Sequence, residues 1–208
     1  MEFSPDTLSA RDMYKVLTGT IVPRPIAWVS SISAGGQPNL APFSYFNAMG
    51  SRPPTLVFGP SIRAPEAGGP KDTLRNVREV GEFVVHVVTE SLAELMNITA
   101  TELPPEVDEF TYAGLTPLPS VRVRPPRLAE SMVTYECVVK QIVVLGDGTG
   151  NGAIVIGEIV YAHIDDRIID ERFHVDMDQL RPIGRLAGPE YTRTGERFVM
   201  KRPPSQLR

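Results

Sequence analysis

The sequence predicts a mainly β protein, a β-barrel decorated by a few peripheral helices. Residues 131–145 and 153–164 are long runs rich in β-branched residues on either side of the glycine-rich segment 146–152, which is the pattern of a hairpin of two extended strands. The 20 prolines and 17 glycines among the 208 residues indicate frequent turns. Many of the predicted strands follow one another without an intervening helix, which disfavours an alternating βαβ arrangement.

The N-terminal elements are a short helix and a hairpin. Ser9 begins a capping-box pattern that opens the helix, and two prolines after residue 22 then exclude further helix. Residues 26–32 have the pattern of a strand, and the turn cluster at 34–39 has hairpin length. Residues 40–48 are the predicted return strand, with Pro42 placing part of it at an edge or a bulge.

The middle of the chain alternates short strands and short helices. Leu74, Val77 and Val80 recur at a helical spacing and predict an amphipathic helix that ends at Gly81. The other predicted elements here are a strand at 55–58, a loop at 60–70, a strand at 83–88, a short helix around 92–96 and a proline-rich excursion at 101–126. From Arg181 onward the chain is basic and irregular, and we expect a single domain over residues 1–208.

The amino-acid composition limits which partners the protein can bind and where in the cell it can be located. The chain has 21 Lys and Arg against 25 Asp and Glu, and its net charge of −4 argues against nucleic-acid binding. No apolar run approaches the roughly 20 residues that span a bilayer, and the first residues lack the apolar segment of a signal peptide. We therefore expect a cytoplasmic protein without membrane contact. The single Cys137 excludes an intrachain disulfide.

Metal and nucleophilic catalysis have no support in the sequence. His86, His163 and His174 lie far apart without metal-ligand spacing. We expect His86 to be a hydrogen-bonded core histidine and the other two to lie at the surface. Cys137 lies within a predicted strand as a small buried residue, and neither a nucleophile elbow nor a dinucleotide fingerprint is present. The sequence predicts no metal site and no catalytic side chain.

Residues 71–73 stand at the start of a predicted helix. The free N–H groups there and the positive end of the helix dipole favour an anion. Lys71 adds a positive charge and Thr73 a hydroxyl donor, a set that suits a terminal phosphate. Asp72 would act as N-cap with only its backbone near the anion. An ordinary capped helix explains the same residues, so two interpretations stay open.

The predicted early hairpin mixes short polar and aromatic side chains. Ser30, Ser31, Ser44 and Asn47 alternate with Trp28, Phe43, Tyr45 and Phe46. A planar heteroaromatic ligand needs such a mixture, with apolar walls to stack on and hydroxyls or amides aimed at ring heteroatoms. A sheet with aromatic residues inside and serines outside is the alternative.

Several motifs in order along the chain carry a family resemblance. They are 23–31 (PRPIAWVSS), 39–44 (NLAPFS) with Asn47, 53–54 (PP), 71–73 (KDT), 107–110 (VDEF), 113–115 (AGL), 136–137 (EC), 156–158 (IGE) and 182–185 (PIGR). Together they make residues 12–200 similar to the flavin reductase-like family of FMN-binding split barrels, in particular to its flavoredoxin-type proteins.

The resemblance implies a Greek-key split barrel that forms a homodimer with FMN at the subunit interface. Lys71 and Thr73 would hold the phosphate, backbone near Ser44 would meet the pyrimidine edge of the flavin, and Trp28 would either wall the site or pack in the core. Arg185 and Tyr191 would reach the flavin of the partner subunit. The expected cofactor-binding residues are Trp28, Ser30, Ser31, Pro42, Phe43, Ser44, Tyr45, Asn47, Lys71, Asp72, Thr73, Arg185 and Tyr191.

The resemblance also implies an activity. NAD(P)H would pass a hydride to FMN in a flavin reductase that supplies a partner monooxygenase, and the protein would need no acid, base or nucleophile of its own. Many relatives carry a histidine where this chain has Gly152, which makes nicotinamide turnover the less secure part. Two alternatives are a non-enzymatic FMN electron carrier or redox sensor and a pyridoxamine-phosphate-oxidase-like flavoenzyme.

Overall fold

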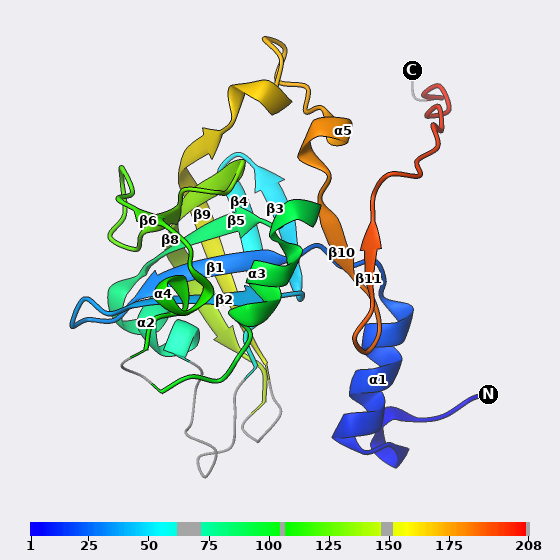
Figure 1. Cartoon of the computed structure of the whole chain (residues 1–208). Coiled ribbons are helices and arrows are strands. Elements are labelled where there is room, and N and C mark those ends of the chain that lie inside the picture. Colours follow the sequence, from blue (N-terminus) through cyan, green and yellow to red (C-terminus); the bar gives the residue numbers. More distant parts are fainter. Residues whose placement is uncertain (62–71, 105–106, 147–151, 207–208) are drawn as a thin grey trace.

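A curved antiparallel sheet forms the body of the molecule in the computed structural model (Figure 1), which describes residues 1–61, 72–104, 107–146 and 152–206. Its seven strands lie in the order β2-β1-β5-β8-β9-β4-β3. They are β1 (Ala27–Ile32), β2 (Pro38–Phe43), β3 (Phe46–Ser51), β4 (Pro54–Phe58), β5 (Glu82–Val87), β8 (Val133–Val144) and β9 (Ala153–Ile164). The predicted mainly β barrel is confirmed. The predictions for Lys71, for the loop at 62–70 and for the turn at 147–151 lie outside the described residues.

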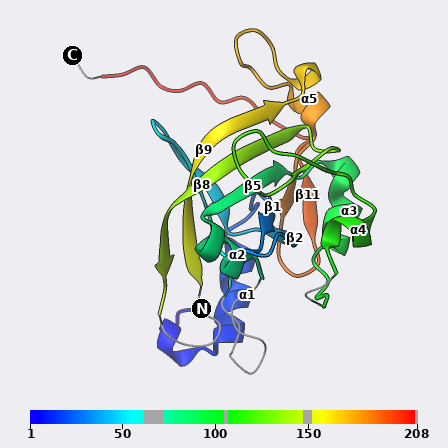
Figure 2. The same cartoon turned by 90° about the vertical axis from the view of Figure 1, so that its left-hand side faces the viewer.

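Short elements surround this sheet. The helices are η1 (Pro5–Thr7), α1 (Ala10–Thr20), α2 (Asp72–Val80), η3 (Glu90–Leu92), α3 (Ala93–Ile98), α4 (Glu109–Ala113), η4 (Asp166–Ile168) and α5 (Met177–Leu180). Two small antiparallel pairs, β6 (Pro117–Leu118) with β7 (Arg127–Leu128) and β10 (Ile183–Arg185) with β11 (Tyr191–Arg193), complete the fold. The long strands β8 and β9 bend across the whole sheet (Figure 2).

The sheet is closed by a very short connection. β2 and β3 lie at opposite ends of the strand order, yet only Ser44 and Tyr45 separate them in the chain. Their nearest ends are therefore at most about 11 Å apart, since each step along the chain spans 3.80 Å. The sheet must curl until its two edges meet at this linker. The prediction of one return strand over residues 40–48 was wrong because closure requires the chain to leave one edge for the other.

The barrel interior is apolar and sealed by α2. Leu74 and Val77 of α2 pack with Val29 of β1, Phe58 of β4 and Phe83 of β5. The three rings of Phe43, Phe58 and Phe83 lie in series, with centroids 5.2 Å apart in each contact. α2 thus combines two roles, because its apolar face closes the interior while its first turn stays near the edge strand β2.

A second apolar layer covers the outside of β1. Trp28 and Ile26 pack there with Met96 of α3 and Phe110 of α4. β1 is therefore buried on both faces, which explains its nearly unbroken run of buried residues.

His86 is a core histidine, as predicted. Leu128 N–H donates to its Nε2 at 2.9 Å, so its Nδ1 carries the proton and donates to Trp28 O, also at 2.9 Å. Burial lowers the pKa of His86 to about 4, so the ring is neutral at physiological pH. Its two contacts attach the β7 segment to the core.

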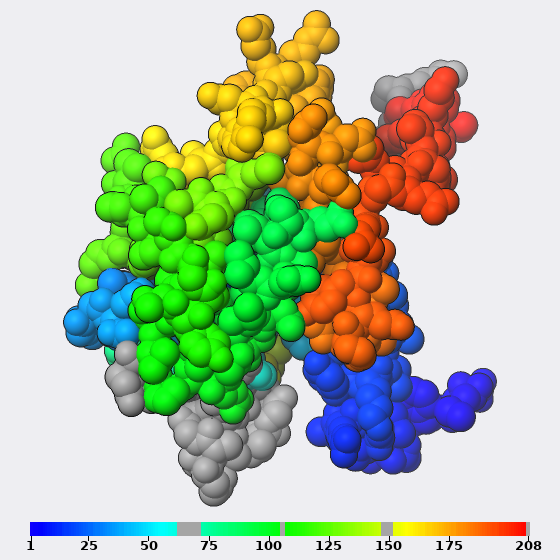
Figure 3. Space-filling view, in the orientation of Figure 1, coloured from blue at the N-terminus to red at the C-terminus, as the bar shows by residue number. Residues whose placement is uncertain are grey.

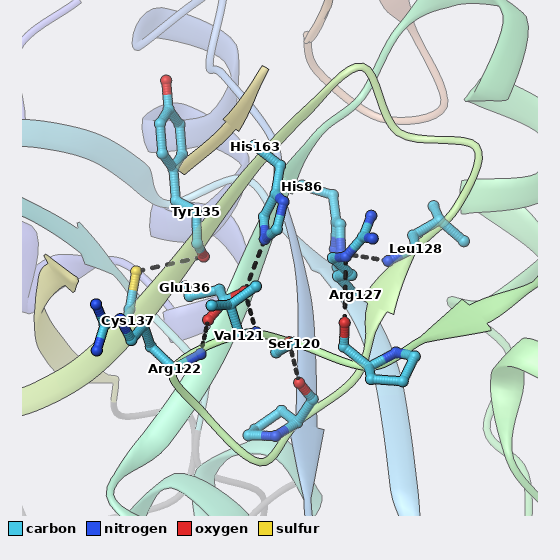
Figure 4. A network of polar contacts seen from close by, with 12 residues as sticks. His86, Ser120, Val121, Arg122, Arg127, Leu128, Tyr135, Glu136, Cys137 and His163 are labelled. Atoms are coloured by element: carbon cyan, nitrogen blue, oxygen red, sulfur yellow. Dashed lines mark hydrogen bonds and ion pairs between the residues drawn. The ribbon is translucent and has the colours of Figure 1, made fainter. Parts of the chain in front are cut away.

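Glu136 anchors the long excursion to β8 (Figure 4). Its carboxylate is completely buried and accepts from Val121 N at 2.8 Å, Arg122 N at 2.6 Å and His163 Nε2 at 2.7 Å. His163 was predicted at the surface and is half-buried there, with 24% of its side chain exposed and its ring held by this carboxylate. Cys137 is buried as predicted.

The prediction of an irregular chain beyond Arg181 was also wrong. β10 and β11 form a hairpin, and Arg185 exchanges two backbone hydrogen bonds with Arg24, at 3.0 and 2.8 Å. The C-terminal hairpin is thereby attached to the segment between α1 and β1.

Gly157 provides a test of interior packing. A Cβ atom there would lie 2.3 Å from Phe83 Cζ, and Phe83 is fixed by the surrounding rings. We expect Gly157→Ala to lower the free energy of unfolding by about 1–3 kcal/mol in urea denaturation, the usual cost of overpacking.

Gly35→Ala is the matched control. Its Cβ would meet nothing nearer than Ser33 Oγ at 3.7 Å, so the change should stay within about 0.5 kcal/mol. Equal unfolding midpoints for the two variants would contradict the packing seen around Phe83.

Glu136 provides a test of the buried network with a defined pH dependence. Burial raises the pKa of Glu136, but the hydrogen bonds from His163, Val121 and Arg122 outweigh burial and leave the pKa lowered. The stabilisation is therefore complete above the unfolded pKa of about 4.3 and is lost as pH falls through the lower folded value. Glu136→Gln turns an N–H group toward a backbone donor and should lower the free energy of unfolding by about 1–3 kcal/mol at pH 7.

The difference between Glu136→Gln and the parent should shrink in acid, as the parent carboxylate becomes protonated. Urea denaturation at pH 7 and pH 3.5 measures both values. A difference that is the same at both pH values would show that the carboxylate charge has no part in holding the excursion.

Candidate functional site

Four buried polar side chains meet beside the first turn of α2. Asn39 Nδ2, on β2, donates to Thr73 Oγ1 at 2.9 Å and to Ser31 Oγ at 3.3 Å. Asn76 Nδ2, one turn further along α2, also donates to Ser31 Oγ, at 3.1 Å. Residues from β1, β2 and α2 thus form one polar cluster in which Thr73 and Ser31 have fixed positions.

Two buried side-chain oxygens, one on β1 and one on α2, lack a partner. Ser30 Oγ and Asn76 Oδ1 have no hydrogen bond within the part of the chain that the structure describes. An unsatisfied buried polar atom costs about 1–3 kcal/mol, so native proteins keep few of them. Asn76 lines a cavity of about 200 Å³. A ligand with hydroxyl groups would supply the donor that Asn76 Oδ1 lacks.

This cavity is the first of three that follow the free edge of β2. A second, of about 110 Å³, shares Asn39 and Asp72 with the first, and a third, of about 150 Å³, shares Pro42 and Ala100 with the second. We call the three together the edge trough. It runs from the first turn of α2 to the two-residue linker that closes the barrel.

The edge of β2 is adapted to lie beside a ligand. Leu40 N–H points away from β1 and donates to Glu109 Oε2 at 2.9 Å. Pro38 and Pro42 lie two residues before and after Leu40, hence on the same edge, and neither has an N–H group. Burial raises the pKa of Glu109, the Leu40 N–H opposes this, and Asp72 and Asp108 add to the rise. The edge is therefore closed to pairing with another strand.

The predicted role of Asp72 as N-cap is not what the structure shows. Asp72 is already the first residue of α2, and its Oδ1 accepts from Arg75 Nη2 at 2.5 Å. The carboxylate is thus held by a cation of its own helix rather than by the free N–H groups. Within the described residues, the Asp72 carboxylate therefore does not compete with an anion for the first turn of α2.

The other end of the edge trough contains Ser44, Arg185 and Tyr191. Arg185 Nη1 donates to the Tyr191 hydroxyl, and the guanidinium lies 4.5 Å from the centroid of the Tyr191 ring. The resemblance placed Arg185 and Tyr191 at the flavin of a partner subunit, whereas here they share a cavity with Pro42 and Ser44 of their own chain.

Some predicted site residues lie elsewhere. Trp28 has no exposed surface, and its Nε1 donates to Thr99 Oγ1 at 2.8 Å, so the core alternative describes it. Phe43 points into the barrel interior. Tyr45, in the linker itself, and Asn47, on β3, are exposed and line no part of the edge trough.

Three site residues escaped the sequence reasoning. Asn39 and Asn76 complete the polar cluster, and Glu109 covers the edge of β2. For Asn39 a signal existed, since it opens the motif at 39–44, but its contact with Thr73 joins residues 34 positions apart. Glu109 likewise lies within the motif at 107–110, although nothing there indicated its contact with Leu40, and Asn76 carried no local pattern.

The fold and the edge trough define a split β-barrel with a groove along one edge strand. Residues 18–179 match the family model described as flavin reductase like domain, and the chain belongs to this family. The family resemblance found in the sequence motifs is thereby confirmed.

The similarity to known proteins covers almost the whole chain. The chain is 37% identical to nitrilotriacetate monooxygenase component B from Bacillus cereus, with a TM-score of 0.91 over 96% of this chain and 98% of that one. It is 33% identical to 2-nitrobenzoate 2-nitroreductase from Pseudomonas fluorescens, with a TM-score of 0.85 over 99% and 100%. An uncharacterized protein of Halalkalibacterium halodurans is 43% identical over 98% of this chain and 97% of its own length.

The described residues contain neither a membrane-spanning helix nor a metal-binding cluster. None of the described helices is long and apolar enough to span a bilayer. Within the same residues, His, Cys, Asp and Glu side chains form no group of three or more suited to a metal ion.

Proposed function

We propose that the protein is an NAD(P)H-dependent flavin reductase that holds FMN in the edge trough. The observation that carries this proposal is the chemistry of the two ends of the trough. One end has a helix N-terminus with a fixed hydroxyl at Thr73, and the other has Ser44 beside the cation of Arg185. An elongated ligand with a phosphate at one end and a polar ring at the other fits this arrangement.

The phosphate end depends on α2. Free N–H groups and the positive end of the helix dipole stabilise an anion at this position. Thr73 Oγ1 already accepts a hydrogen bond from Asn39, so its own proton is free to be donated to a phosphate oxygen. We propose that Lys71 adds its charge here, and that ribityl hydroxyls satisfy Asn76 Oδ1.

The ring end depends on the barrel linker. Pro42 offers an apolar edge, and Ser44 provides a hydroxyl and backbone groups for the pyrimidine side of the ring. Arg185, stacked on Tyr191, adds a positive charge in the same cavity. Ser30 and Ser31 lie behind the trough and shape it rather than line it.

When bound, FMN supplies the two-electron chemistry, and the side chains of the trough bind and orient it. This explains why the sequence has no catalytic triad or metal motif. Orientation of the nicotinamide against the flavin face is then the contribution that the chain makes to the rate.

We propose a homodimer, because a large apolar area is left uncovered. Tyr14, Leu17 and Ile21 on one face of α1 are 58%, 37% and 57% exposed. α1 also stands out from the body of the molecule (Figure 3). A second copy would cover this face and deepen a trough that is shallow for FMN. A partner monooxygenase in the cytoplasm belongs to the same proposal, supported by the 37% identity to a monooxygenase component B.

The second candidate function is an FMN electron carrier. The family resemblance implies a histidine just before β9, whereas this chain has Gly152, which has no side chain to place a nicotinamide. In that case the electrons would come from a protein donor rather than from NAD(P)H.

Thr73→Val tests the phosphate end. The variant keeps the shape of the side chain and loses the hydroxyl, so the dissociation constant for FMN should rise about tenfold or more, since a hydrogen bond to a charged group contributes about 1.5–3 kcal/mol. Titration followed by quenching of FMN fluorescence measures it.

Thr116→Val is the control, because Thr116 is exposed and its side chain lines no part of the trough. Its FMN affinity should equal that of the parent. Equal affinity for Thr73→Val and the parent would place the phosphate away from α2.

Anaerobic mixing of the FMN-loaded protein with NADH or NADPH separates the reductase from the carrier. We expect the visible flavin absorption to bleach within seconds with at least one of the two nucleotides. A flavin that stays oxidised with both, but is reduced by dithionite, would favour the electron carrier.

A further inference from the structure

Arg24 is a cation buried beneath the ring end of the edge trough. Only 5% of its surface is exposed. Its guanidinium donates to three backbone carbonyls: Nη1 to Thr18 O at 2.6 Å and to Ile21 O at 2.9 Å, and Nη2 to Leu186 O at 2.9 Å. Nε contacts Ser44 Oγ at 3.4 Å. Among the described residues no carboxylate forms an ion pair with it.

The end of α1 makes this burial possible. Thr18 O is one of the last carbonyls of α1, and Ile21 is its C-cap. Such carbonyls lack partners within the helix and carry the negative end of its dipole. Arg24 therefore satisfies them while they solvate its charge. Partial charges offset only part of a full positive charge, whereas a carboxylate would cancel it.

The remaining positive potential is directed at the barrel linker. Ser44 is in contact with Arg24 and lines the same cavity as Arg185, whose backbone pairs with that of Arg24. The potential also reaches Tyr45: burial and Tyr14 raise the pKa of the Tyr45 phenol, and Arg24 opposes that rise. Two cations thus approach the linker, one from behind it and one from the cavity.

We propose that Arg24 is a positioning residue that orients Ser44 and raises the reduction potential of the flavin held at the ring end of the trough. The inference rests on the proposed function, since it assigns the ring end to FMN. It concerns a residue that touches the flavin only through Ser44.

The charge of the reduced ring is the physical reason. Two electrons and one proton convert the neutral oxidised ring into an anion near neutral pH, with its negative charge on the pyrimidine side. A fixed positive potential stabilises this form more than the neutral oxidised form. The contact from Arg24 Nε also polarises the Ser44 hydroxyl, and this polarisation makes the hydroxyl a stronger hydrogen-bond donor to the ring.

Arg24→Gln and Arg24→Lys form the first test. The glutamine variant removes the charge and the lysine variant keeps it. We measure the midpoint potential of bound FMN by dye equilibration with dithionite, together with the affinity for oxidised FMN. Arg24→Gln should lower the ratio of the affinity for reduced FMN to the affinity for oxidised FMN about tenfold. For a two-electron couple this corresponds to a fall of about 30 mV in the midpoint potential. Arg24→Lys should keep this ratio within about twofold, and Arg167→Gln, an exposed site, should not change it.

Ser44→Asp and Ser44→Asn form a second pair that keeps every carbonyl contact of Arg24, should Arg24→Gln fail to fold. The aspartate places a negative charge beside the guanidinium, whereas the asparagine has the same shape without that charge. Both variants lose the Ser44 hydroxyl, so the charge is measured by the difference between them, and we expect the potential of the aspartate variant to lie below that of the asparagine variant by a similar amount.

The outcomes distinguish a failure of the role proposed for Arg24 from a failure of the proposed FMN-binding function. A residue that only holds the fold would weaken oxidised and reduced FMN equally, so an unchanged potential in Arg24→Gln and Ser44→Asp would overturn the inference and leave the proposed function intact. If the parent protein does not bind FMN, both fall together.

Discussion

The two-residue linker between β2 and β3 is the constraint on which the rest of the structure depends. Ser44 and Tyr45 join strands at opposite ends of the sheet order, so the sheet can form only as a barrel whose two edges meet there. The same closure leaves β2 as an edge strand, which in an ordinary sheet would invite pairing with another chain. Here two prolines and the Glu109 carboxylate occupy that edge, and the edge trough lies along it.

Closure also brings together residues that are distant in sequence. α2 seals the barrel interior with Leu74 and Val77, which forces Thr73 and Asn76 against Ser31 on β1 and Asn39 on β2. The polar cluster is thus a consequence of apolar packing. Of its buried side-chain nitrogen and oxygen atoms, only Asn76 Oδ1 lacks a partner within the described residues, and Asn76 lines the cavity in which we place the ligand.

The barrel class, most strand positions and the family could be predicted from local pattern and motif order. The break in residues 40–48 could not, because those residues alternate like a single strand and only closure interrupts them. Strands β10 and β11 are three residues each, too short for periodicity to detect.

Trp28 suited either a site wall or a core, and only the second apolar layer under α3 decided between them. Thr73 and Ser31 were predicted separately, whereas Asn39, which joins them, was visible only in three dimensions.

An acidic chain that is to hold an anionic ligand needs local positive potential without losing it to its own carboxylates. At the proposed phosphate end, Asp72 is paired with Arg75 of the same helix, so its charge is offset within α2. At the ring end, the buried charge of Arg24 is solvated by the last carbonyls of α1 and by Leu186 O. A carboxylate in their place would make burial of Arg24 easier, but it would cancel the potential at Ser44. In the proposed complex, backbone dipoles would therefore serve both ends of the trough. The N-terminus of α2 would meet the anionic ligand directly, whereas the C-terminus of α1, which has the opposite polarity, solvates the cation of Arg24.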